Sequence, residues 1–271
     1  MAAVRESTAK NSSAGRQDKK KVRNAVLAVF LLLLVSGAAG AGFWGVRKLL
    51  FDANPRFLLR EIRVNGSGYW KDHAGDLAEK IGLKKGTNLF ALDVKKIRKD
   101  LARVPNVENS FVYRILPDTL IIRVTERVPR AFLSRENSPL VADGNAVVMP
   151  RSQSMRSYAR LPVIMDVSLR GIKSGDSFEK IKPAMELIMT AVRDYPDITI
   201  YRISLRDPKK LHVYLKYKYN RFNIHHLVLP VRNRGMKFML MAYQSAVINA
   251  HRIGETRNNY DLSYDGKCVI R

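Results

Sequence analysis

One uncharged, apolar segment near the start of this 271-residue chain constrains its architecture more than any other feature. Every residue from 25 to 35 is apolar, and residues 36–46 are small, apolar or aromatic. No charged residue lies between Arg23 and Arg47, so the uncharged segment covers 24–46. About 20 such residues in a helix cross the hydrocarbon core of a bilayer. The sequence therefore predicts one membrane-spanning helix, with a short tail on one side and a large domain on the other.

The charge beside this segment predicts its orientation. Residues 1–23 contain seven Lys or Arg against two Asp or Glu, and 19–23 adjoin the apolar run directly. By the positive-inside rule, the tail is cytoplasmic and the chain from about residue 48 is extracytoplasmic. The polar composition of 1–23 predicts disorder. A cleaved signal peptide is the alternative, because 36–41 offers small residues for cleavage, but the uncharged residues that follow, with Phe43 and Trp44, favour a retained helix.

The outer part is strongly basic, since it carries most of the net charge of +24. Nucleic acid is the usual partner of such a surface, but an extracytoplasmic domain meets none. Anionic lipid headgroups, anionic envelope polymers, an acidic protein, or no partner at all remain open. The single cysteine, Cys268, allows no internal disulfide and no cysteine-based metal site.

Residues 57–129 predict a small module with the order strand, helix, helix, strand, strand. Alternation predicts a strand over 59–65, and helical spacing predicts helices over 70–81 and 93–103, the second capped by Asp93. Gly82 suits the end of the first helix, where a residue with positive φ is favoured. Strands follow over 107–115 and 119–127, joined by a turn at Pro117.

Residues 130–271 predict a mostly antiparallel β domain with two helices, so the fold class is α+β. The expected strands cover 131–133, 139–142, 146–149, 161–164, 199–205, 210–217 and 226–229, with a last hairpin over 259–271. The expected helices cover 176–194 and 235–252. Asp143-Gly144-Asn145 predicts a tight turn.

No motif predicts catalysis, a cofactor or a metal. His225 and His226 are adjacent in an expected strand, so they face opposite sides of the sheet. The segment 82–88 lacks the spacing of a phosphate-binding loop, and nothing near Cys268 predicts an activating base. Glu126 or Asp143 could serve a glycan hydrolase, but strand-end and turn roles explain them equally well.

The last hairpin has two interpretations. Tyr260, Leu262 and Tyr264 share one face, while Asp261 and Ser263 share the other. The hairpin is either an ordinary core pair or a sheet edge that recruits a strand from a partner.

The outer part resembles the bacterial FtsQ/DivIB family, and 57–129 looks like its POTRA module. The resemblance rests on segments 59–66, 86–90, 101–107, 114–122, 126–129 and 141–145. Ile115-Leu116 replaces the usual Trp before Pro117, and 151–220 departs further from the family pattern.

The resemblance implies a non-enzymatic scaffold in the plasma (inner) membrane at the division septum, which binds FtsB- and FtsL-type proteins and helps control septal peptidoglycan synthesis. It implies no cofactor, small-molecule substrate or nucleic-acid partner. Tyr264 is expected at the centre of strand addition. The implied residues for that strand addition are Tyr260, Asp261, Leu262, Ser263, Tyr264, Asp265 and Gly266. Recruitment through the second POTRA strand would use Val107, Phe111 and Tyr113.

Two other functions remain open from the sequence. One is a POTRA-containing component of envelope secretion or assembly, and the other is a wall-modifying enzyme. Localisation around the whole envelope would favour the first, and turnover of purified peptidoglycan would establish the second.

Overall fold

The computed structural model describes residues 6–48, 54–154, 161–218, 220–232, 235–264 and 267–270. The chain divides into two compact units. The first contains Met1–Leu59, Gly86–Leu92 and Leu116–Asp118. The second contains Arg60–Lys85, Asp93–Ile115 and Thr119–Arg271.

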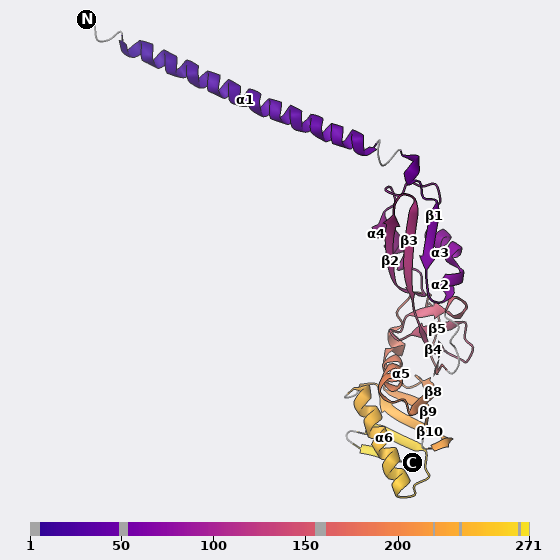
Figure 1. Cartoon of the computed structure of the whole chain (residues 1–271). Coiled ribbons are helices and arrows are strands. Elements are labelled where there is room, and N and C mark those ends of the chain that lie inside the picture. The colour runs from indigo at the N-terminus through magenta and orange to yellow at the C-terminus, as the bar shows by residue number, and fades with distance from the viewer. Residues whose placement is uncertain are drawn as a thin grey trace. The chain divides into compact units, whose positions relative to one another are not determined.

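Helix α1 (Glu6–Arg47) dominates the first unit and is one continuous ribbon in Figure 1. Its segment Val26–Val46 is long and apolar enough to cross a membrane, and the described residues contain one such helix. This agrees with the span predicted over 24–46. The helix also includes 6–23, where the composition predicts disorder. The Lys, Arg, Gln and Ala residues there are good helix formers, so they extend a helix already nucleated by the apolar segment at little cost.

Short backbone contacts hold the rest of the first unit together. A 3₁₀ turn, η2 (Pro55–Phe57), is capped by Asn54, whose side chain accepts from the Arg56 amide. The Leu59 amide donates to the Thr87 carbonyl at 2.8 Å, and the Gly86 amide donates to the Leu59 carbonyl at 2.8 Å. Leu59 is therefore bonded to the 86–89 turn, although the alternation predicts it as the first strand residue.

The POTRA part of the second unit has the order β-α-α-α-β-β, with three helices where the sequence predicts two (Figure 1). Its elements are β1 (Glu61–Asn65), α2 (Tyr69–Asp72), α3 (Ala74–Lys80), α4 (Val94–Leu101), β2 (Val107–Ile115) and β3 (Thr119–Glu126). The sheet order is β1-β3-β2, with β1 parallel and β2 antiparallel to β3. Asp93 caps α4 as predicted, accepting from the amides of Lys95 and Lys96.

The helix predicted over 70–81 is interrupted at His73. Its backbone has φ −121° and ψ 37°, which separates α2 from α3. The His73 ring stacks on Tyr69 with centroids 3.9 Å apart, and Nδ1 lies 2.8 Å from the Tyr69 carbonyl oxygen. Trp70 and Leu77 are buried, so each helix keeps its own contact with the core.

Nine strands form the sheet of the β domain. They are β4 (Pro129–Leu133), β5 (Leu140–Asp143), β6 (Val148–Pro150), β7 (Val163–Met165), β8 (Ile198–Ser204), β9 (Lys210–Tyr217), β10 (Asn220–Pro230), β11 (Asn259–Tyr264) and β12 (Lys267–Ile270). Their spatial order is β12-β11-β10-β9-β8-β7-β4-β5-β6. Five neighbouring pairs are antiparallel, and three are parallel. The mostly antiparallel domain predicted from sequence is therefore confirmed.

Helices α5 (Lys182–Asp194) and α6 (Met236–Arg252) pack on this sheet through apolar side chains. Two short 3₁₀ turns, η3 (Arg151–Gln153) and η4 (Glu179–Ile181), complete the described elements. Inward-facing residues of β9 alternate with half-buried ones along the whole strand. Leu211, Val213, Leu215 and Tyr217 therefore join the core, as the period-2 pattern of 210–217 predicts.

Candidate partner-binding edges

Strand β11 is paired on both sides. It runs parallel to β10, where Tyr260 is opposite Leu227, and antiparallel to β12, where Tyr260 is opposite Ile270. Tyr260 and Asp261 therefore have strand partners on both sides. The expected part of Tyr260, Asp261, Leu262, Ser263 and Tyr264 in strand addition stays a prediction. Asp265 and Gly266, the other two expected residues, lie outside the described residues.

Strand β12 forms the end of the sheet beyond β11. Within the described ranges no strand pairs with its outer side. The opposite end of the sheet is covered: the Val148 amide of β6 donates to the Asp176 carbonyl at 2.9 Å, and the Gly175 amide donates to the Val148 carbonyl at 2.7 Å. An isolated bridge joins Val147 to Ser177. The two ends of the sheet therefore differ, and β12 is the open edge.

Side chains of the last hairpin divide between two faces as predicted. Tyr260 and Leu262 are 3% and 7% exposed and belong to the core beneath α6, while Tyr264 is 45% exposed. On the other face, the Ser263 hydroxyl donates to the Asp261 carboxylate at 2.5 Å. Tyr264 lies opposite Lys267 at the turn end of the hairpin, so its ring is accessible beside the open edge.

A groove of about 740 Å³ runs between α6 and the last hairpin. Phe238, Ala242 and Ser245 line it from α6, and Cys268 and Ile270 line it from β12. A strand added to β12 would place alternate side chains toward this groove. The edge therefore offers both backbone groups for pairing and an apolar surface for side chains.

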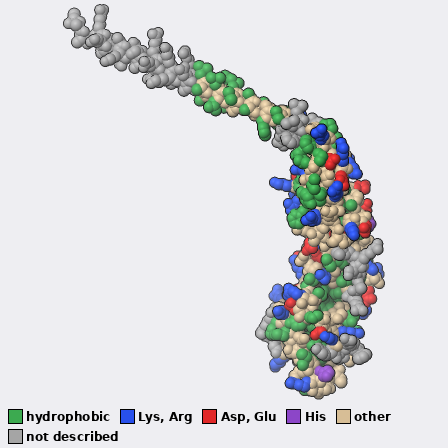
Figure 2. Space-filling view, in the orientation of Figure 1, with side chains coloured by type: hydrophobic (Ala, Val, Ile, Leu, Met, Phe, Trp, Pro, Cys, Tyr) green, Lys and Arg blue, Asp and Glu red, His purple; other side chains and the backbone are tan. Residues whose placement is uncertain are grey.

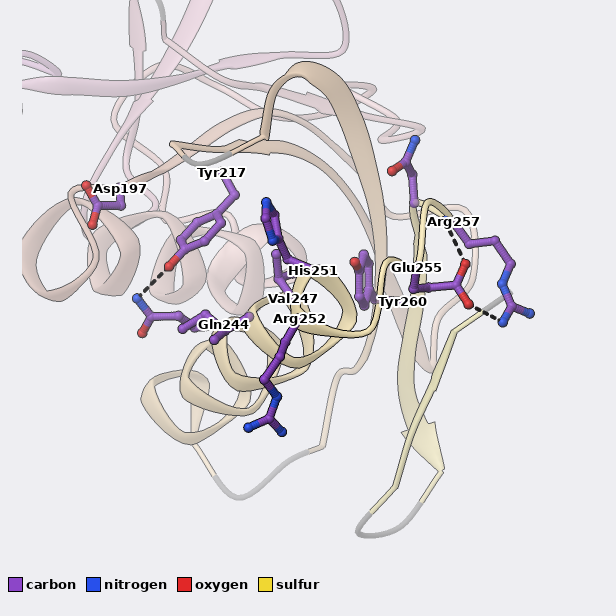
Figure 3. A pocket seen from close by; sticks show the side chains of 11 residues that line it. Asp197, Tyr217, Gln244, Val247, His251, Arg252, Glu255, Arg257 and Tyr260 are labelled. Carbon is purple, nitrogen blue, oxygen red and sulfur yellow. Dashed lines mark hydrogen bonds and ion pairs between the residues drawn. The ribbon is translucent and has the colours of Figure 1, made fainter.

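A second pocket, of about 570 Å³, lies where α6 ends and β11 begins (Figure 3). Gln244 donates to the Tyr217 hydroxyl at 3.1 Å on one side of this pocket. On the other side Arg257 pairs with Glu255, and this guanidinium lowers the pKa of the Glu255 carboxyl to about 2. These charged and polar groups pair with each other, so a structural role is enough to explain their presence in the pocket.

The histidines face opposite sides of the sheet, as predicted. His225 is fully buried, its Nδ1 lies 2.7 Å from the Tyr243 hydroxyl, and burial lowers its pKa. The Nε2 of His226 lies 3.1 Å from Nδ1 of His212 on the other face; burial and then His212 lower the His226 pKa. Among the described residues no three His, Cys, Asp or Glu side chains gather as metal ligands.

Structural contacts account for both carboxylates considered for hydrolysis. The Glu126 carboxylate accepts from the amides of Gly68, Tyr69 and Trp70 at 3.0, 2.8 and 3.0 Å. Asp143 pairs with Arg127 and accepts from the amide of Asn145 in the predicted turn. Glu126 stabilises the start of α2, and Asp143 stabilises the turn that follows β5.

Strand β2 is one of the two edge strands of the POTRA sheet, and it carries exposed apolar side chains. Phe111 and Tyr113 are 53% and 39% exposed, and Ile115 and Leu116 extend this apolar surface. Hydrophobic side chains gather over this part of the POTRA domain in Figure 2. Val107, by contrast, is 2% exposed. Its side chain belongs to the core, and its expected part in recruitment stays a prediction.

Comparisons with known proteins match this architecture. A family model described as "POTRA domain, FtsQ-type" matches residues 57–127. The chain is 29% identical over 153 residues to the cell division protein FtsQ of Koribacter versatilis, covering 55% of this chain and 43% of that protein. It is 27% identical over 134 residues to the cell division protein DivIB of Clostridium acetobutylicum, covering 49% and 53% of the two chains. The chain thus spans about half the length of these curated relatives.

An amino-terminal apolar helix followed by a POTRA domain and a sheet-rich region defines the class of single-anchor POTRA proteins. Within that class, this chain is similar to the FtsQ/DivIB proteins, and its residues 57–127 match the FtsQ-type POTRA model.

Proposed function

We propose that this protein is a non-enzymatic scaffold of bacterial cell division, anchored by α1 with its amino terminus in the cytoplasm. Its relatives are named cell division proteins, which supports this role. The outer domains act at the division septum of the plasma membrane. They bind FtsB- and FtsL-type proteins there and help control septal peptidoglycan synthesis.

The open edge at β12 is the observation that carries this proposal. An added partner strand pairs with the outer backbone groups of β12, and its side chains reach the groove beside α6. Tyr264 contributes an exposed ring at one end of that edge. The binding strand is thus displaced by one position, from β11 to β12, relative to the expectation from sequence.

A Tyr264→Lys variant of the full chain tests this mechanism. We expect its affinity for the FtsB/FtsL-type complex of the same bacterium to fall about tenfold or more, because a contact aromatic is lost. Tyr201→Lys is the matched control, since Tyr201 is 40% exposed on β8 inside the sheet. Equal affinities of both variants and the parent would refute strand addition at β12.

A second contact surface on POTRA supports recruitment to the septum. Phe111 and Tyr113 project from the same face of β2, two residues apart, and both are exposed. Apolar surface of this kind marks a protein contact. We assign recruitment to these two residues.

A further inference from the structure

Helix α4 presents an exposed surface that is almost entirely cationic. Ile97 and Leu101 are buried against the POTRA core. The remaining surface is what we call the α4 basic face. It consists of Lys95, Lys96, Arg98, Lys99 and Arg103, all exposed.

This arrangement is electrostatically unfavourable for the helix itself. Lys95 and Lys99 are four residues apart on the helix, so this pair repels. Lys95 and Lys96 also lie in the first turn, where the helix dipole disfavours cations, whereas the dipole favours Arg98 and Lys99 in the last turn. The Arg103–Asp100 contact of 3.1 Å offsets part of this repulsion. The Asp93 cap and the buried residues Ile97 and Leu101 stabilise α4 without help from its cations. Binding of an anionic partner would therefore account for the repulsion between these cations.

A hollow beside the helix adds a specific place for an anion. It measures about 270 Å³ and lies between α4 and the start of β2. Lys95, Arg98 and Lys99 line it, together with the polar residues Asn109 and Ser110. Glu108 is the one carboxylate among the residues that line it. Three cations around one carboxylate suit a phosphodiester group.

The sequence also limits how far from a bilayer the POTRA match can begin. The apolar segment ends at Val46, and the POTRA match begins at residue 57. The ten intervening residues reach at most about 35 Å when fully extended. A POTRA domain on so short a tether meets headgroups at high effective concentration.

We propose that the α4 basic face docks on anionic phospholipid headgroups of the leaflet from which α1 emerges. Multiple lysines and arginines near an anionic bilayer each add to the attraction, which salt weakens. The docking needs the membrane anchor but does not depend on any role in division. It would hold POTRA against the membrane surface while the β domain remains available to partners.

Amide hydrogen exchange of the full chain in lipid nanodiscs tests the proposal. One set of discs contains phosphatidylcholine alone, and the other contains an equal mixture with phosphatidylglycerol. We expect exchange over 94–101 to be about threefold slower or more in the anionic discs, because docking suppresses local opening. High salt should abolish the difference.

Variants separate docking from nonspecific attraction. Lys95→Glu with Lys99→Glu should remove the protection. Lys173→Glu with Lys180→Glu changes the same charge at two exposed β-domain positions and should leave it intact. Equal exchange in both kinds of disc would overturn the proposal. So would equal protection in neutral discs supplied with soluble glycerol phosphate, which would assign the site to free anions. A variant that divides abnormally but keeps its lipid-dependent protection would support docking, and its defect would concern the proposed function alone.

Discussion

The guanidinium of Arg127 lies 2.8 Å from the carboxylate of Asp143 in a contact that is largely removed from solvent. Their side chains are 17% and 5% exposed. Arg127 follows directly after β3, and Asp143 ends β5, so this ion pair joins the end of the POTRA sheet to the first hairpin of the β domain. Glu126, the preceding residue, fixes the start of α2 through three amides. Two adjacent charged residues therefore hold segments on both sides of the domain junction.

Replacing Asp143 with Ala should destabilise the protein strongly. Arg127 would be left buried without its partner, and breaking such a pair costs about 3–5 kcal/mol. Chemical denaturation of the full chain measures the change. Glu179→Ala is the matched control because it breaks the exposed Lys182–Glu179 pair, which solvent screens and whose loss should leave stability nearly unchanged. A loss at Asp143 no larger than at Glu179 would contradict this account.

Replacing Glu126 with Gln should loosen the start of α2. Gln retains one acceptor oxygen where the carboxylate offers two, and the remaining hydrogen bonds are no longer strengthened by a charged acceptor. We expect a cost of about 1–3 kcal/mol. Amide exchange at Gly68, Tyr69 and Trp70 provides the direct measurement. Unchanged protection of all three amides would show that the carboxylate is dispensable.

Acid should destabilise the β domain through His225. Burial lowers the pKa of its imidazole below the ordinary value of 6.5, so the unfolded chain binds a proton more readily than the folded one. Stability is therefore highest above pH 6.5 and falls as the pH drops below it. Denaturation of parent and His225→Gln from pH 7.5 to 5 checks this, with exposed His251→Gln as control. A slope unaltered by His225→Gln alone would refute the assignment.

Replacing Phe111 with Ser should impair septal recruitment while leaving stability nearly unchanged. The side chain is 53% exposed, so little buried area is lost on substitution. A fluorescent fusion in dividing cells measures the midcell fraction. Met241→Ser, which is 50% exposed on α6 and does not line the groove beside β12, serves as the control for loss of surface apolar area. Normal midcell localisation of the Phe111 variant would remove β2 from the recruitment surface.

Periodicity predicts the type of most elements well, because buried side chains recur at the spacing expected for one face of a helix or strand. The strand predicted over 210–217 is β9, and Asp93 caps α4 where the sequence places the cap. The break at His73 is invisible to periodicity, because it depends on a ring stacking on Tyr69 and not on an apolar spacing.

The unpaired edge of the large sheet was harder to predict than the fold. Which strand ends a sheet depends on pairings between distant segments, such as β10 with β11, and no local pattern encodes them. The closed state of β6 likewise depends on Gly175 and Asp176, some 25 residues further along the chain. The sequence pattern of a hairpin predicts strands but does not predict which of them, here β12, ends the sheet.

The covered end at β6 limits what this sheet can build. Head-to-tail stacking of copies into an endless ribbon would require β12 of one molecule to pair with β6 of the next, and residues 175–177 already occupy that position. Growth can occur at one end alone and stops once that end is filled. Among the described residues, the sheet can therefore be extended at its β12 end but not at its β6 end, which works against fibre formation.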